Sequence, residues 1–173
     1  MARRDPLARP ERLIPLVYAY VAYRLGSGPD ADDVTSETME HAYRYRDRYD
    51  PAKGEPMAWL IGIARNCVAD LVASRERVVD EPVPESATEE MEEQAMRRLT
   101  LTRAVARLDE RERELIALRY GADLTARQIA GMLGLRPNAV EVALHRALGR
   151  LRAELDRDPT GELRPSTSGA VRF

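Results

Sequence analysis

Between residues 124 and 151 the apolar positions recur at helical spacing, and one glycine, Gly134, divides them into two groups. Before that glycine, Thr125 and Gln128 have the spacing of a capping box, which begins a helix. Gly134 stands where helices end in a left-handed residue, and Pro137 suits the first turn of a second helix. The pattern predicts two short helices around a tight turn. Their expected core side chains are Ile129, Ala130, Leu133, Val140, Leu144, Ala147, Leu148 and Leu151.

This pair of helices has the form of a helix-turn-helix, in which the second helix can lie in the DNA major groove. The polar side of the second helix would then face the bases. An ordinary helical hairpin in a bundle is the alternative. The side chains on that polar side are Asn138, Glu141, Val142, His145 and Arg146.

The same spacing predicts helices elsewhere, whereas strand-like alternation is nearly absent, so we expect an all-α fold. Asp30 and Asp109 are expected to cap two of the helices. The cleanest apolar stripe belongs to the helix expected over about 56–75, which should be the spine of an N-terminal bundle. The other helices are expected over 10–25, about 31–49, 94–108 and 110–120. The stripe consists of Leu60, Ile63, Ala64, Cys67, Val68, Leu71 and Val72.

Residues 76–93 break this regularity, because prolines and acidic side chains dominate them. The segment is expected to be a flexible acidic linker, and about 20 such residues span roughly 25 Å. It would let two small helical domains sit apart on one long partner. The expected division is a first domain over 9–76, the linker over 77–93, a second domain over 94–157 and a flexible tail over 158–173.

Composition limits the classes of function. The net charge is −2 and Lys53 is the only lysine, so the whole chain lacks the basic excess of a protein that binds DNA alone. Either basic groups cluster on one face or a partner supplies affinity. The lone cysteine, Cys67, is expected to be a buried thiol. Without a signal peptide or a membrane-spanning stretch, we expect a soluble, cytoplasmic protein with no membrane insertion.

Two groups of side chains are candidate contact sites. Acidic residues gather at the start of the second helix, including Asp32 and Asp33; they form either a solvated face or a docking face for a basic partner. Trp59 lies near Arg65 and Asn66, and could stack on nucleic-acid bases or pack on the rim of the bundle. No phosphate-binding glycine loop or metal-ligand spacing occurs, so we expect no enzyme, no cofactor and no metal site.

Short motifs in both domains together resemble the extracytoplasmic-function (ECF) group of bacterial RNA polymerase sigma factors. The resemblance covers residues 13–155 approximately, and its strength lies in the order and spacing of the pieces. In the first domain they are 30–34 with Glu37, 49–54, 59–60, 63–66 and 70–71. In the second they are 108–113, 118–120, Leu124, 129–130, 133–134, Val140, 145–147 and Leu151.

The resemblance implies a sigma factor that binds core RNA polymerase, through its clamp helices and flap, and recognises and melts promoter DNA. It implies that the linker threads a polymerase channel, and it suggests restraint by an anti-sigma protein. The implied polymerase-docking residues are Asp32, Asp33, Val34, Glu37 and Met39. Those for the single-stranded minus-ten element are Tyr49, Asp50, Lys53, Trp59, Arg65 and Asn66. Those for the minus-thirty-five duplex are Arg136, Asn138, Glu141, Val142, His145 and Arg146.

The sequence departs from the family pattern in the recognition helix. Ala139, Glu141, Val142 and Ala143 stand where the family often has Thr, Lys, Ser and Arg, which removes phosphate donors. Glu141 could accept a hydrogen bond from a cytosine amino group, or it could weaken duplex binding. Two alternatives therefore stay open: a stand-alone helix-turn-helix regulator, and a sigma-like adaptor that docks on polymerase but binds promoters poorly.

Overall fold

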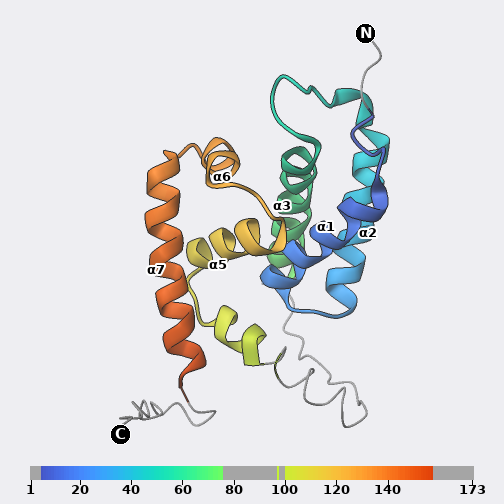
Figure 1. The fold of residues 1–173 in the computed structure, drawn as a ribbon. Coiled ribbons are helices and arrows are strands. Elements are labelled where there is room, and N and C mark those ends of the chain that lie inside the picture. The colour runs from blue at the N-terminus through green and yellow to red at the C-terminus, as the bar shows by residue number, and fades with distance from the viewer. Residues whose placement is uncertain (1–4, 76–96, 98–99, 158–173) are drawn as a thin grey trace, which may run out of the picture.

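The computed structural model describes residues 5–75, 97 and 100–157, and these contain helices and no strand (Figure 1). The predicted all-α fold with two helical regions is confirmed. The predicted linker and the tail from 158 lie outside the described residues. The elements are α1 (Pro10–Leu25), α2 (Pro29–Arg44), the 3-10 turn η1 (Arg46–Arg48), α3 (Pro56–Arg75), α5 (Glu110–Ile116), the π-helical turn η2 (Ala117–Gly121), α6 (Ala126–Leu133) and α7 (Pro137–Leu155). Residues 100–106 are also helical.

Local signals determined most helix boundaries. Helices α1 and α3 begin at Pro10 and Pro56, the first residues of their expected ranges, and the fixed φ of proline suits a first helical turn. The side chain of Asp109 accepts a hydrogen bond from the amide of Glu112, which caps α5. The predicted capping box at Thr125 is present at the start of α6, and Gly134 ends that helix with φ +66°.

Two boundary predictions were wrong. Helix α2 starts at Pro29 with Gly28 in the capping position, and Asp30 lies inside the first turn, where it pairs with Arg75 of α3. Helix α2 also ends at Arg44, followed by the short turn η1 rather than a continuous helix to residue 49. The helix expected over 110–120 changes to π geometry at Ala117. Pro29 suits the first turn of α2, which places Gly28 rather than Asp30 in the capping position.

The N-terminal region consists of α1, α2 and α3, with α3 packed against both of the others. Helix α3 is long and apolar enough to cross a membrane by length and composition alone. Leu60, Ala64 and Val68 of its predicted stripe, however, are almost fully buried in the protein core, whereas Val72 of the same predicted stripe is 39% exposed. It is therefore the spine of a helical bundle, as the sequence predicted.

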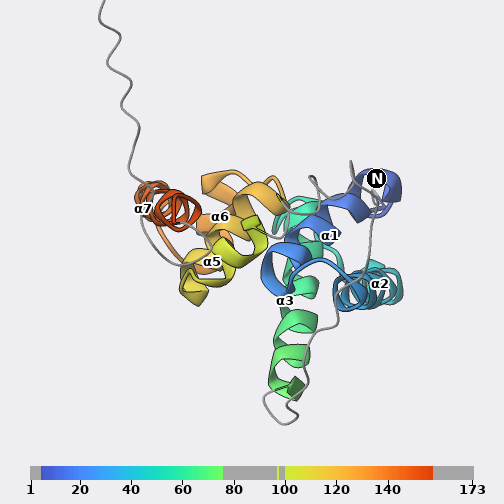
Figure 2. The same cartoon turned by 90° about the horizontal axis from the view of Figure 1, so that it is seen from below.

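The C-terminal region is built from residues 100–106, α5, η2, α6 and α7. Helix α7 packs along α5 and α6 (Figures 1 and 2). A small separate hydrophobic cluster packs residues 100–108 against α7, because Val105 and Leu108 are buried against Ala147 and Leu151. The buried residues of α7 are those that the sequence predicted for its apolar side, apart from half-buried Leu148.

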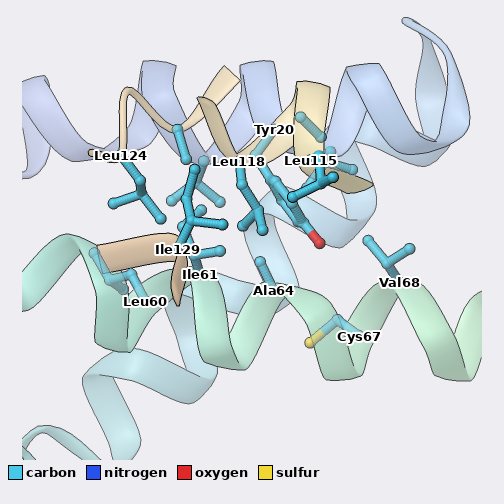
Figure 3. Packing of buried hydrophobic residues seen from close by; sticks show 14 of the residues in the cluster. Tyr20, Leu60, Ile61, Ala64, Cys67, Val68, Leu115, Leu118, Leu124 and Ile129 are labelled. Carbon is cyan, nitrogen blue, oxygen red and sulfur yellow. The ribbon is translucent and has the colours of Figure 1, made fainter. Parts of the chain in front are cut away.

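One continuous core joins the two regions (Figure 3). Leu118 and Ile129 from the C-terminal region lie beside Ile61 of α3, and all three are fully buried. The turn η2 lies along α1 so closely that a Cβ added to Gly121 would stand 2.7 Å from the Cα of Tyr20. Only glycine fits there. The regions therefore pack together in this structure, whereas the linker length had suggested that they could sit apart.

Candidate nucleic-acid and partner interfaces

The acidic start of α2 forms one candidate interface. Asp32, Asp33 and Glu37 are exposed, so their carboxylates are available to a basic partner. Val34 is only 2% exposed and belongs to the core, and Met39 packs against the core in a half-buried position. The structure therefore divides the five expected docking residues into three surface acids and two residues that hold α2 in place.

The first turn of α3 presents Trp59 beside the loop that precedes this helix. The Trp59 and Tyr49 rings lie 5.5 Å apart between centroids, in a tilted arrangement. Tyr49 is 5% exposed, and its hydroxyl donates a hydrogen bond of 2.9 Å to the carbonyl of Gly54. Asp50 accepts a hydrogen bond of 3.0 Å from the amide of Ala52, which shapes the same loop. Tyr49 and Asp50 thus build the loop, while half-buried Trp59 and exposed Lys53 are accessible to a ligand.

Arg65 and Asn66 occupy the next turns of α3. Asn66 is exposed, whereas the Nε of Arg65 lies 2.8 Å from a carboxylate oxygen of Glu114 in α5. This contact crosses between the regions. One expected minus-ten residue is therefore already engaged by the C-terminal region.

Glu114 is the centre of a polar cluster between the regions, and its side chain is 12% exposed. It accepts hydrogen bonds from the Tyr20 hydroxyl at 3.1 and 3.2 Å and pairs with the guanidinium of Arg24 at 2.7 Å. Burial, together with the nearby Glu114 carboxylate, raises the pKa of the Tyr20 phenol well above its ordinary value. The phenol therefore stays protonated and donates to Glu114. No sequence signal pointed to this cluster, because 94 positions separate Tyr20 from Glu114.

Helix α7 presents the third candidate interface. Its apolar side is buried, and its opposite side is open to solvent along the helix. All of the expected minus-thirty-five residues are exposed, namely Arg136, Asn138, Glu141, Val142, His145 and Arg146. Val142 is 52% exposed, so an apolar side chain also lies on this open side.

A further group of polar side chains lies between α2 and α3. Cys67 is 3% exposed, so the predicted buried thiol is confirmed, and burial raises its pKa. The sequence analysis predicted no metal site. The structure nevertheless brings Glu37, His41 and Cys67 together, with one ligand atom of each within 4.8 Å of the others. The four-residue spacing of Glu37 and His41 along a helix was the sequence signal for it.

Known proteins match both regions. The Sigma-70 region 2 family matches residues 11–78, and the Sigma-70 region 4 family matches residues 98–151. The ECF RNA polymerase sigma factor SigD of Mycobacterium tuberculosis is 38% identical over 162 residues, covering 84% of this chain and 74% of SigD.

Solved structures share the fold. The sigma factor RpoE of Bartonella quintana, in complex with the anti-sigma factor NepR, gives a TM-score of 0.67 at 20% identity and covers 86% of this chain and 94% of its own. CnrH, in complex with the cytosolic domain of CnrY, gives a TM-score of 0.60 at 26% identity and covers 90% of this chain and 94% of its own.

Proposed function

Because the chain belongs to the ECF group of RNA polymerase sigma factors, we propose that its two regions divide polymerase docking and promoter reading between them. Sigma factors are transcription initiation factors, and this chain directs promoter-specific initiation with core RNA polymerase. The chemistry of RNA synthesis belongs to the polymerase, so the chain itself needs no catalytic group. Its place of action is the cytoplasm, where the polymerase is.

The acidic face of α2 docks on the clamp helices of the polymerase. Asp32, Asp33 and Glu37 supply exposed negative charge on one helix, and an acidic first turn is compatible with the helix dipole. Charge complementarity of this kind increases association rates and fixes register. Val34 and Met39 act indirectly, since they pack α2 onto the bundle and keep the carboxylates in place.

The surface around Trp59 receives the single-stranded minus-ten element. An aromatic ring beside a cationic side chain is the usual platform for unpaired bases, and Trp59 with Lys53 provides one. Tyr49 packs against the tryptophan ring rather than contacting DNA itself, because it is buried and hydrogen-bonded to the carbonyl of Gly54. Asn66 offers an amide for a base edge, and Arg65 joins it once its contact with Glu114 is released.

The exposed side of α7 reads the minus-thirty-five element. A helix with one buried and one open side can enter a major groove about 12 Å wide. Asn138, His145 and Arg146 supply donors, and Glu141 accepts from a cytosine amino group. Because Glu141 is acidic and Val142 is apolar, few side chains on this helix can donate hydrogen bonds to DNA phosphates. This favours one second candidate function, a sigma-like adaptor that docks on polymerase but reads duplex DNA weakly.

The packed arrangement must open at a promoter. The two promoter elements are named for positions about 25 base pairs apart, which is roughly 85 Å of duplex at about 3.4 Å per base pair. Helix α3, with 20 residues, is only about 30 Å long. Residues 76–96, fully extended, reach about 70 Å. The linker can therefore let the regions separate, and the packed form is the free or restrained state.

An anti-sigma protein is the natural partner of that restrained state. RpoE and CnrH were both solved in complexes, with the anti-sigma factor NepR and the cytosolic domain of CnrY respectively, and the packed form resembles both in fold. A protein that binds across both regions would keep the α2 face and the Trp59 surface from polymerase and DNA. The observation that carries the proposal is the combination of three exposed acids on α2 with an open recognition side on α7.

The test is reconstitution with core RNA polymerase and a promoter library, followed by mapping of transcript starts. We expect starts that depend on the protein. Asp33→Arg should weaken core binding about tenfold or more, equivalent to 1.4 kcal/mol. Glu11→Arg, an exposed acid in the first turn of α1, is the matched control and should leave core binding unchanged. Core binding without protein-dependent starts would support the adaptor instead.

A further inference from the structure

Three side chains with different metal-binding atoms meet at the junction of α2 and α3. Glu37 and His41 are one helical turn apart and lie on the same side of α2. Cys67 reaches them from α3, and its Sγ lies 3.9 Å from the Nδ1 of His41. One ligand atom of each residue falls within 4.8 Å of the others. The cluster is separate from the Trp59 surface and from the exposed side of α7.

The spacing of these atoms is close to that of a metal site. Zinc binds sulfur at about 2.3 Å and nitrogen at about 2.0–2.1 Å, so a tetrahedral centre holds the two atoms about 3.5 Å apart. The Sγ and Nδ1 atoms would need to approach each other by only about 0.4 Å, which a small rotamer change provides.

The donor set selects the class of metal. A thiolate and an imidazole favour borderline transition metals such as Zn²⁺ and Co²⁺, whereas Mg²⁺ and Ca²⁺ require oxygen ligands. Three protein ligands leave a fourth tetrahedral position for water. Of the three side chains, Glu37 is exposed, His41 is half-buried and Cys67 is buried. A metal ion can therefore enter from solvent on the Glu37 side, while Cys67 binds it from the protein core.

We propose that Glu37, His41 and Cys67 form a binding site for a divalent transition metal of the zinc class, which ties α2 to α3. On binding, the Cys67 thiol releases its proton to solvent and the thiolate sulfur bonds to the metal. The metal also binds the carboxylate of Glu37, which is then no longer available to a basic partner of α2. Metal occupancy would therefore reduce polymerase docking; this consequence rests on the proposed docking face, whereas metal binding does not.

The experiment is a titration of the purified, chelator-treated full chain with Co²⁺, followed by absorption spectroscopy. We expect one saturable site with a thiolate-to-cobalt charge-transfer band, which added Zn²⁺ then abolishes by displacement. Glu37→Gln should weaken Co²⁺ binding at least tenfold, and His41→Asn should weaken it further. Cys67→Ser should remove the charge-transfer band.

Matched controls separate this site from adventitious binding. Glu40→Gln changes an exposed carboxylate on the same helix, and His145→Asn changes the only other histidine of the chain. Both variants should bind Co²⁺ as the unaltered protein does. If Cys67→Ser unfolds, Glu37→Gln decides, because Glu37 is exposed and its loss leaves the core intact.

The proposal is overturned if no charge-transfer band appears, if Glu37→Gln and His41→Asn bind Co²⁺ unchanged, or if binding is lost in His145→Asn instead. None of these readouts needs polymerase. A chain that binds Co²⁺ at this site but never binds core polymerase would contradict the proposed function and leave the metal site standing.

Discussion

Helices α3 and α7 both carry side chains expected to contact promoter DNA, but the structure leaves them in different conditions. The six expected residues on or next to α7 are all exposed. On α3, Arg65 is paired with Glu114 of the other region, and Ile61 is buried under Leu118 and Ile129. In the packed arrangement one residue of the proposed minus-ten surface, Arg65, is engaged by the C-terminal region, and the proposed minus-thirty-five surface is free.

The difference has a simple physical cause. Helix α7 is amphipathic, with one apolar side that its own region covers. Helix α3 is apolar around more of its circumference, so α1 and α2 cover one side and the C-terminal region covers another. An apolar helix left half covered would expose surface to water at a cost of about 25 cal/mol per Å². In the free protein the C-terminal region covers this apolar surface. After the two regions separate, a partner must cover it instead.

The largest effect is expected from removing the carboxylate at the centre of the contact between the regions. Glu114→Ala leaves the Tyr20 hydroxyl and the Arg24 guanidinium without their buried acceptor, and should destabilise the packed arrangement by about 3 kcal/mol. Urea unfolding measures this change. Glu110→Ala is the control, because Glu110 pairs with Arg24 from an 83% exposed position and should cost under about 1 kcal/mol. Equal effects of the two variants would contradict this assignment.

A slightly smaller effect is expected where the two backbones touch. Gly121→Ala places a Cβ 2.7 Å from the Cα of Tyr20, and neither backbone can rotate away, so η2 must move off α1 at a cost of about 2 kcal/mol. Limited proteolysis should show easier cleavage between the regions. Gly149→Ala, in α7 with no atom near the added Cβ, should be neutral or stabilising. A Gly121→Ala protein that keeps the stability of the unaltered chain would show that the contact is not needed.

Trp59→Ala tests the accessible part of the minus-ten surface. Loss of one stacking platform should reduce promoter opening about tenfold, which corresponds to 1.4 kcal/mol, and leave core binding nearly intact. Permanganate footprinting of the open complex measures the opening. Because Trp59 also packs on Tyr49, a circular dichroism melt must accompany the assay. A fall in core binding parallel to the loss of opening would assign the tryptophan to packing.

The smallest effect on the stability of the packed arrangement is expected from a change of pH. Burial raises the pKa of the Tyr20 phenol above its ordinary value of 10.0, so its contribution to stability is complete below about pH 10 and is lost only as pH rises above that. The contribution of Tyr20 should then be constant from pH 7 to about pH 9 and fall in stronger alkali, where a phenolate would face Glu114. Stability curves of the unaltered protein and Tyr20→Phe measure this. If both proteins lose the same stability above about pH 10, Tyr20 is excluded as the group responsible for that loss.

Short-range signals were enough to predict much of this fold. Pro10 and Pro56 gave the starts of α1 and α3, the Thr125 capping box gave the start of α6, and Gly134 gave its end. Each of these features acts within one turn of helix. The exposed recognition side of α7 was predictable for the same reason, since helical periodicity separates it from the buried side.

The relations between distant segments were not predictable. Ile61 was not among the residues of the expected stripe, and in the structure it is buried beside Leu118 and Ile129 of the C-terminal region. Gly121 comes directly after the helix expected over 110–120, and no sequence signal showed that it admits the backbone of α1. The partner of Arg65 is 49 positions away in sequence, and no spacing rule connects such residues.

The central claim is that the packed regions separate when the protein initiates transcription. Ser27 and Arg103 are exposed residues on opposite sides of the contact, next to the close approach of Gly26 and Thr102. Ser27→Cys and Arg103→Cys, labelled in a Cys67→Ala background, report that distance by spin-label or fluorescence measurement. We expect one short distance in the free protein and a distance longer by tens of ångströms in the polymerase–promoter open complex, in line with the roughly 85 Å between the promoter elements. A short distance that persists in transcribing complexes would contradict the account.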